Sequence, residues 1–246
     1  MLTSKFDSKV ANFWDRESRD WGDKYGKRTS YFYRSRTIYQ LLASTGVRQA
    51  SILDYGCGSG DITFPMLRDG HSVTGVDIAE GMVRKACERA EEFGLASKAS
   101  YYHLDNGIFS KISSQKFDVI ISSSVLEYVE SDMSLVKTFH SILKDGGYLL
   151  VSIPDSKSFF CKLDKWMYAN RRWMPRFIPI EKLGYLDIQK RQYDIGLFAE
   201  AVTKIGFKLL ARKHNTITLQ RGAIMEWISN IPGLGMLAIV MFQKTH

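Results

Sequence analysis

The chain of 246 residues is 45% hydrophobic and 13% aromatic, which allows a large buried core and excludes disordered and fibrous proteins. Its net charge is +8, and Cys57, Cys87 and Cys161 show neither a disulfide framework nor the spacing of zinc ligands. Because residues 1–20 contain no apolar leader, we expect a reducing, cytoplasmic location.

The predicted elements begin with a mainly helical segment over residues 1–50. From Ser51 onward, short apolar runs alternate with amphipathic stretches, the pattern of repeated β-α units around a parallel sheet. We expect strands at Ser51–Tyr55, Ser72–Val76, Ala99–His103, Val119–Ser122 and Tyr148–Ile153. Helices are expected at Ile62–Asp69, Glu80–Phe93 and Ser131–Leu143, with a turn at Asp145–Gly147 before the fifth strand.

The alternating pattern breaks at Pro154. Residues 154–193 are rich in Trp, Tyr, Arg and Lys and are too long for an ordinary connection, so they are interpreted as an inserted cap. A helix at Ile195–Ile205 follows, with strands near Phe207–Lys213 and at Met236–Gln243. We expect a single domain comprising an N-terminal helical cap (1–50), a cofactor-binding core (51–153), a substrate cap (154–193) and a C-terminal helix and strand pair (194–246).

Acidic residues and glycines mark the ends of the first three strands. The first strand runs into Asp54-Tyr55-Gly56-Cys57-Gly58-Ser59-Gly60, in which closely spaced glycines let the backbone approach a ligand. The carboxylate two positions before the first glycine suits an ammonium group better than a pyrophosphate. Asp77 ends the second strand, where such folds place a ribose-hydroxyl acceptor, although a lone Asp there could also be a helix cap. Asp105 and Asn106 follow the third strand, where adenine-binding groups are expected.

These motifs, with those at 117–129 and 143–154, resemble the successive motifs of class I S-adenosylmethionine-dependent methyltransferases. The nearest resemblance is to the small-molecule branch with the ubiquinone-type O-methyltransferases and the magnesium-protoporphyrin methyltransferase. It implies an α/β, Rossmann-like fold with a seven-stranded sheet, an antiparallel last strand and helices on both faces. It also implies S-adenosylmethionine as methyl donor and S-adenosylhomocysteine as product.

The resemblance assigns roles residue by residue. The glycines would frame the methionine end of the donor, Asp54 would orient its ammonium region, Asp77 would hold the ribose hydroxyls and Asp105 the adenine amino group. Tyr25, Tyr33 or Arg34 would close over the donor, with no motif to choose among them. The full expected cofactor set is Asp54, Gly56, Cys57, Gly58, Gly60, Asp77, Ile78, Asp105, Asn106, Ser122, Ser123 and Tyr25, with Cys57 interpreted mainly as a small buried filler.

The acceptor side carries weaker signals. Ubiquinone-type relatives have a metal-associated Glu-x-x-Glu-His run after the fourth strand, whereas this chain reads Ser124-Val125-Leu126-Glu127-Tyr128, so two of three ligands are missing and no metal is expected. Glu127 and Tyr128 are candidates for the catalytic or acceptor site, with the alternative that both merely begin a helix. In the cap, Trp166, Arg171 and Arg172 are candidate substrate contacts, with the alternative of a solvated amphipathic helix.

Positive charge favours an anionic partner. Residues 1–50 carry ten basic and five acidic side chains, and residues 154–193 carry nine and four, so each segment has a charge of +5. The leading hypothesis is O-methylation of a small or lipid-linked anionic metabolite. A tRNA or rRNA methyltransferase is an alternative because the pI is about 9.3, although an Asn-Pro-Pro-Tyr motif is absent. A non-catalytic binding subunit and peripheral membrane contact through 224–242 also stay open, as does the oligomeric state.

Overall fold

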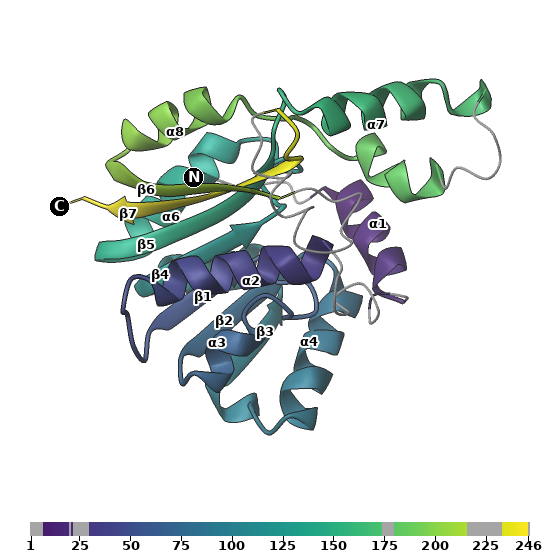
Figure 1. Cartoon of the computed structure of the whole chain (residues 1–246). Helices are drawn as coiled ribbons and strands as arrows, with labels where there is room; N and C mark the ends of the chain where they lie inside the picture. Colours follow the sequence, from purple (N-terminus) through teal and green to yellow (C-terminus); the bar gives the residue numbers. More distant parts are fainter. Residues whose placement is uncertain (1–6, 20, 22–29, 174–179, 216–232, 246) are drawn as a thin grey trace.

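The computed structural model describes residues 7–19, 21, 30–173, 180–215 and 233–245. Its centre is a seven-stranded sheet with strand order β3-β2-β1-β4-β5-β7-β6 (Figure 1). The strands are β1 (Ser51–Tyr55), β2 (Ser72–Asp77), β3 (Ala99–His103), β4 (Phe117–Ser123), β5 (Leu143–Pro154), β6 (Phe207–Asn215) and β7 (Leu237–Lys244). Strands β1 to β5 pair in parallel and β7 is antiparallel to both neighbours, which confirms the expected fold class.

Helices cover both faces of this sheet (Figure 1). The described helices are α1 (Ser8–Ser18), α2 (Ser30–Ala43), α3 (Phe64–Arg68), α4 (Glu80–Glu92), α5 (Asn106–Ser113), α6 (Asp132–Ile142), α7 (Phe159–Ala169) and α8 (Ile195–Thr203), with 3-10 turns η2 (Ala96–Lys98), η3 (Arg171–Trp173) and η4 (Ile180–Asp187). On one face α2 and α3 share a buried apolar cluster with Ile52, and on the other α5, α6 and α8 share one with Leu53. Because both faces are covered, the central strands β1 and β4 are buried at nearly every position.

Two expectations about local structure were wrong. Asp145–Gly147 was expected to be a turn, but these residues lie within β5, which starts at Leu143. The pairing of β5 with β4 shifts register here, and a Cβ on Gly147 would lie 2.8 Å from the backbone oxygen of Asp118, so the glycine allows close strand contact. Helix α5 was not predicted, although Asp105 caps it by accepting a hydrogen bond from the Ile108 backbone N–H at 2.7 Å.

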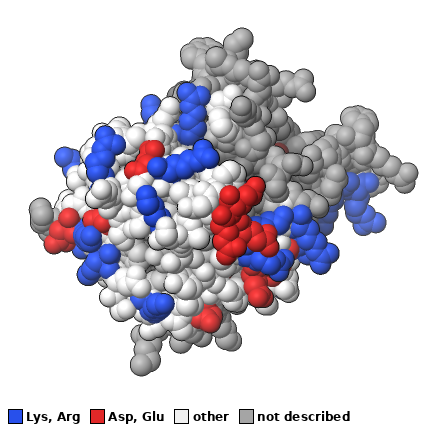
Figure 2. Space-filling view, turned by 90° about the horizontal axis from the view of Figure 1, so that it is seen from below, with Lys and Arg blue, Asp and Glu red and all other residues white. Residues whose placement is uncertain are grey.

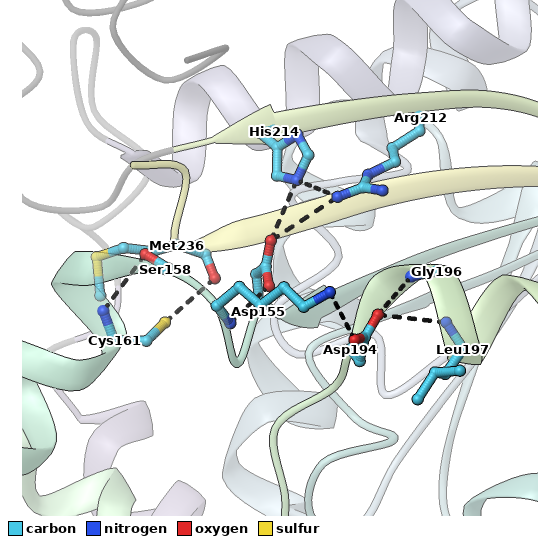
Figure 3. A network of polar contacts seen from close by, with 10 residues as sticks. Asp155, Ser158, Cys161, Asp194, Gly196, Leu197, Arg212, His214 and Met236 are labelled. Atoms are coloured by element: carbon cyan, nitrogen blue, oxygen red, sulfur yellow. Dashed lines mark hydrogen bonds and ion pairs between the residues drawn. The ribbon is translucent and has the colours of Figure 1, made fainter. Parts of the chain in front are cut away.

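Polar contacts surround the two ends of the insertion at 154–193, around Asp155 and Asp194 (Figure 3). At its base, Asp155 and Tyr193 form a parallel β-bridge. The buried carboxylate of Asp155 faces His214 at 3.4 Å and Arg212 at 3.9 Å, both near the end of β6. These contacts fix both ends of the insertion at the carboxyl edge of the parallel strands, where ligands bind in open α/β sheets.

Candidate functional site

The loop between β1 and α3 brings bare backbone to the carboxyl edge of the sheet. Gly56, Gly58 and Gly60 have φ values of 81°, 53° and 75°, which favour glycine. A Cβ on Gly56 would lie 2.1 Å from Cγ2 of Val125, so the segment after β4 packs directly on the loop. In contrast, a Cβ on Gly58 would meet no atom of the described residues within 4 Å, so this part of the loop faces open space among them.

Asp77, the last residue of β2, is hydrogen-bonded to that loop. Its Oδ2 accepts a hydrogen bond from the Gly58 backbone N–H at 2.8 Å, and its Oδ1 accepts one from the Ala79 backbone N–H at 2.9 Å. Burial raises the pKa of Asp77, while these two backbone donors act to lower it. Since a carboxylate offers about four acceptor positions, Asp77 can hold the loop and still accept hydrogen bonds from a ligand.

Asp54, near the end of β1, is fully buried. Its Oδ2 accepts a hydrogen bond from Oγ1 of Thr63 at 3.0 Å, whereas its Oδ1 has no hydrogen-bond partner among the described residues. Burial raises the pKa of Asp54 to about 7, with a further contribution from the negative charge of Asp77. A buried acceptor without a donor is costly, so this end of the loop suits a ligand that brings a cation or a hydrogen-bond donor.

The segment after β4 is a turn that helix α2 holds in place. Ser124 has a φ of 55°, an uncommon value for a residue with a side chain. Its Oγ accepts a hydrogen bond from Nη1 of Arg34 at 2.7 Å, and its backbone N–H donates to the Ser152 oxygen at 3.0 Å. Helix α6 begins only at Asp132, so Glu127 and Tyr128 lie in this turn. The alternative expectation, that the two residues merely begin a helix, was wrong.

Glu127 is a buried carboxyl group in this turn, with only 2% of its surface exposed. Its Oε2 has no hydrogen-bond partner within the part of the chain that the structure describes. Burial raises the pKa of Glu127 to about 8, although the charge of Arg34 and a hydrogen bond with Ser124 act to lower it. A carboxyl group that titrates near neutral pH can take a proton from a reacting group and release it again.

An aromatic row from the N-terminal segment reaches the same turn. The ring of Tyr128 makes an edge-on contact with Trp14 at 5.7 Å, and Trp14 contacts Trp21 in the same manner at 5.7 Å. Trp21 in turn contacts Tyr31, whose ring lies 4.8 Å from the guanidinium carbon of Arg34. Burial raises the pKa of Tyr128, so its hydroxyl stays protonated at neutral pH. The N-terminal segment therefore contributes an apolar wall next to Glu127.

Comparison with known proteins decides the family. The family described as "Methyltransferase domain" matches residues 13–210. The chain belongs to the class I S-adenosylmethionine-dependent methyltransferases. It is 30% identical to a ubiquinone biosynthesis O-methyltransferase from Ruegeria pomeroyi over 69% of this chain and 72% of that one, and 31% identical to one from Maricaulis maris over 70% and 68%. Two other relatives of that name, from Ruegeria sp. and Psychrobacter arcticus, align over 50% and 44% of their length.

Solved structures share the fold of this methyltransferase. The magnesium protoporphyrin IX methyltransferase of Synechocystis with bound S-adenosylhomocysteine superposes with a TM-score of 0.70 at 16% identity, covering 97% of this chain and 99% of that one. The N-methyltransferase NodS of Bradyrhizobium japonicum, also in complex with S-adenosylhomocysteine, gives 0.64 at 16% identity, covering 96% and 99%. The expectations of an enzyme of this family with S-adenosylmethionine as its cofactor are thus confirmed.

The residues of the methyltransferase fit that donor on structural grounds. Asp54 leaves one buried carboxylate oxygen for a donor group, Gly58 faces open space, and Asp77 keeps acceptor capacity beside it. These three features lie on adjacent strands or on the loop between them. Together they match a ligand with an ammonium group and vicinal hydroxyls.

The other expected cofactor residues of the methyltransferase differ in their burial and in their hydrogen-bond partners. Cys57 is buried, and its Sγ lies 3.0 Å from where a Cβ on Gly75 would be, which fits a packing role. Asp105 is exposed and already occupied as the cap of α5, and Asn106 is the first residue of that helix. Ile78 is half-exposed, and Tyr25 lies outside the described residues. Ser122 and Ser123 are both buried. The Oγ of Ser122 has no partner among the described residues, whereas that of Ser123 is hydrogen-bonded to Ser152.

The expected substrate contacts of the methyltransferase lie on the surface of the insertion. Trp166 is exposed on α7, and Arg171 and Arg172 are exposed on η3, whereas Glu127 is buried. Within the described ranges, no group of three or more His, Cys, Asp or Glu side chains could hold a metal ion, and no helix has the length and apolar character needed to cross a membrane. The end of the apolar run at 224–242 forms the buried strand β7, and residues 224–232 lie outside the described residues.

Sequence reasoning missed the groups that bury Glu127. Lys190, near the end of the insertion, donates its backbone N–H to the Glu127 backbone oxygen at 2.8 Å. Arg34 was considered only as a group that closes over the donor, but it bonds to the turn after β4. These contacts join segments far apart in the chain, and no local spacing signals them.

On the face that Figure 2 shows, basic and acidic side chains are interspersed and form no continuous basic field.

Proposed function

We propose that this methyltransferase transfers a methyl group to a hydroxyl oxygen of a small or lipid-linked metabolite that also carries an anionic group. The buried carboxyl group of Glu127 is the observation that carries the proposal. A hydroxyl acceptor must lose its proton during transfer, and Glu127, whose pKa burial raises to about 8, would accept that proton as the pH rises toward this value. The "O-methyltransferase" names of the curated relatives support the same reaction class.

The donor side is proposed to be held by the glycine loop and its neighbours. Asp54 would pair with the ammonium group, Asp77 would accept from the ribose hydroxyls, and the loop at Gly56–Gly60 would frame the methionine end. Bound S-adenosylmethionine would supply an electrophilic methyl group. Asp105, as the cap of α5, gives one acceptor position on Oδ1 to the Ile108 N–H, and it would accept from the adenine amino group with one of its remaining positions.

On the acceptor side, Glu127 would hold the proton that leaves the hydroxyl group. Arg34 is a buried cation whose charge acts on Glu127, so it can also attract an anionic acceptor and favour the ionised carboxylate. Trp14 and Tyr128 provide an apolar surface that would exclude water from the reacting hydroxyl group. The insertion at 154–193 would close the site as a substrate cap.

The test combines acceptor choice with one substitution. Hydroxylated aromatic acids and their neutral esters would be supplied with S-adenosylmethionine, and products would be detected by mass spectrometry. We expect the acids to react with a higher kcat/KM than the esters, because the esters lack the anionic group. Glu127→Gln should lower kcat by about 10²–10⁴ and abolish the rise in activity near pH 8.

The control is Glu92→Gln, which changes an exposed carboxylate at the carboxyl end of α4. It should leave kcat unchanged, and calorimetric binding of S-adenosylmethionine should be the same in both variants. If Glu127→Gln kept full activity, and if its pH profile and that of the unmodified protein were both flat, Glu127 would not be the proton acceptor. Equal turnover of acids and esters would contradict the anionic acceptor.

A further inference from the structure

Helix α7 presents large aromatic side chains to solvent. Phe159 and Trp166 on the helix are 57% and 58% exposed, and Trp173, on the turn η3 that follows, is 87% exposed. Most other large aromatic side chains of the described chain are buried or half-buried. Three exposed aromatic residues on one short segment are unusual for a surface that contacts only water.

These side chains share one face of the helix. Phe159, Lys162 and Trp166 are spaced i, i+3 and i+7, which places them on the same side of an α-helix. The opposite side carries Cys161 and Asp164, both buried. This arrangement separates an outer aromatic and basic face of α7 from an inner face that packs on the molecule.

The outer face is positively charged. Lys162 and Lys165 on α7 are exposed, as are Arg171 and Arg172 on η3. Asp164 is the acidic residue of α7, and it points inward, where its Oδ2 accepts a hydrogen bond from the Tyr185 hydroxyl at 3.3 Å. Four basic groups therefore surround the exposed aromatic rings, and α7 adds no negative charge to this face.

We propose that the outer face of α7, continued by Arg171–Trp173, docks on the surface of an anionic lipid bilayer. Tryptophan and phenylalanine side chains favour the boundary between headgroups and acyl chains, and lysine and arginine bind anionic headgroups while their aliphatic stems cover apolar surface. Aromatic side chains also anchor protein interfaces and stack on the bases of single-stranded nucleic acids, so binding of either without vesicle binding would overturn the proposal.

The position of α7 in the fold makes this docking useful. Helix α7 follows directly from the carboxyl end of β5, and the turn with Glu127 follows the carboxyl end of the parallel neighbour β4. Both therefore lie at the same edge of the sheet, and Figure 1 shows α7 extending outward beyond that edge. A bilayer bound to α7 would lie at the same edge of the molecule as the proposed site and would present a lipid-linked acceptor to it. Only this use of the docking rests on the proposed function.

Vesicle binding by the full chain tests the proposal without any methyl transfer. The protein would be sedimented with vesicles of phosphatidylcholine containing about a third phosphatidylglycerol, and with phosphatidylcholine alone. We expect binding to the anionic vesicles, falling about fivefold for each basic residue neutralised in Lys162→Gln, Lys165→Gln and Arg172→Gln. Trp166→Ala with Trp173→Ala should lower binding at least tenfold.

Matched controls separate this surface from general stickiness. Leu197→Ala removes an exposed apolar side chain from α8, and Lys98→Gln with Lys208→Gln removes two exposed charges from other elements, so these variants should bind vesicles as the unmodified protein does. Brominated lipids should quench the fluorescence of the unmodified protein, and the quenching should disappear in Trp166→Phe/Trp173→Phe. No binding to anionic vesicles, equal binding to both vesicle types, or loss only in the control variants would overturn the proposal. Salt-sensitive retention on RNA without vesicle binding would also overturn it.

Discussion

Glu127 is held in the folded protein at a cost that depends on pH. Burial raises its pKa from the ordinary value of 4.5 to about 8, so between these values the folded protein keeps a proton that the unfolded chain releases. Stability contributed by this difference is present below about pH 4.5 and is lost as the pH rises through about 8. A residue of this kind belongs to the chemistry of a site more naturally than to its packing.

Replacing this carboxyl group should therefore stabilise the protein in alkaline solution. Glu127→Gln keeps the shape of the side chain and removes the ionisation, so the variant should gain about 1–3 kcal/mol over the unmodified protein near pH 8.5 and little near pH 5. Thermal unfolding followed by circular dichroism at both pH values would measure the difference. A gain of the same size at both pH values would mean that the ionisation is not the cause.

Arg34 should tune Glu127 through both its charge and its hydrogen bond. Its positive charge lowers the pKa of Glu127, so Arg34→Ala should move the rise in activity to higher pH and also free Ser124 from its 2.7 Å hydrogen bond. Ser124→Gly removes that hydrogen bond and the one with Glu127, which also lowers the Glu127 pKa, but it keeps the charge of Arg34 and tolerates the φ of 55°. Its pH profile should therefore shift in the same direction but less than that of Arg34→Ala. Equal shifts in the two variants would assign the effect to the hydrogen bonds of Ser124 instead of the charge of Arg34.

Among the elements, the loop between β1 and α3 allows a test of donor binding in which backbone strain is controlled. Gly58 and Gly146 both have positive φ, 53° and 73°, and in each a Cβ would meet no atom within 4 Å. Alanine at either position should cost about 1–2 kcal/mol of stability. Because only Gly58 faces the proposed donor site, Gly58→Ala should weaken calorimetric binding of S-adenosylmethionine by about tenfold or more, and Gly146→Ala should leave it unchanged. Equal binding by both variants would remove the donor from this loop.

The elements that the sequence predicts well are those with local signals. Strand β1 and its loop follow from an apolar run that ends in closely spaced glycines, and both bounds of β1 agree with the structure. Helix α5 was not predicted, because its N-cap residue, Asp105, was interpreted only as a ligand contact. Candidate site residues divide in the same way. Glu127 was selected by its position after β4, but its contact with Lys190 and the effect of the Arg34 charge come from segments far away in the chain, which no local pattern indicates.

At the scale of the whole molecule, three distant segments meet at Lys190. Its backbone N–H binds the Glu127 oxygen, and its ammonium group pairs with Asp7, the cap of α1, at 2.9 Å and also with Glu130. The end of the insertion, the turn after β4 and the N-terminal helix are thereby joined around the proposed acceptor site. Partly exposed ion pairs such as Lys190 with Asp7 contribute little to overall stability, so this contact is better suited to position segments than to hold the fold.

Lys190→Met should separate these two roles. The variant loses both carboxylate partners but keeps the backbone hydrogen bond to Glu127, so the free energy of unfolding should change by less than about 1 kcal/mol. Helix α1 should exchange its backbone amides faster with deuterium, and the KM for the acceptor should rise while donor binding is unchanged. Lys204→Met, which breaks an exposed pair with Glu200 on α8, is the matched control and should change neither exchange in α1 nor KM. Unchanged exchange in α1 of Lys190→Met would show that other contacts hold the N-terminal helix, such as Trp14 with Tyr128 and the hydrogen bond from the Gly81 N–H to Asp15.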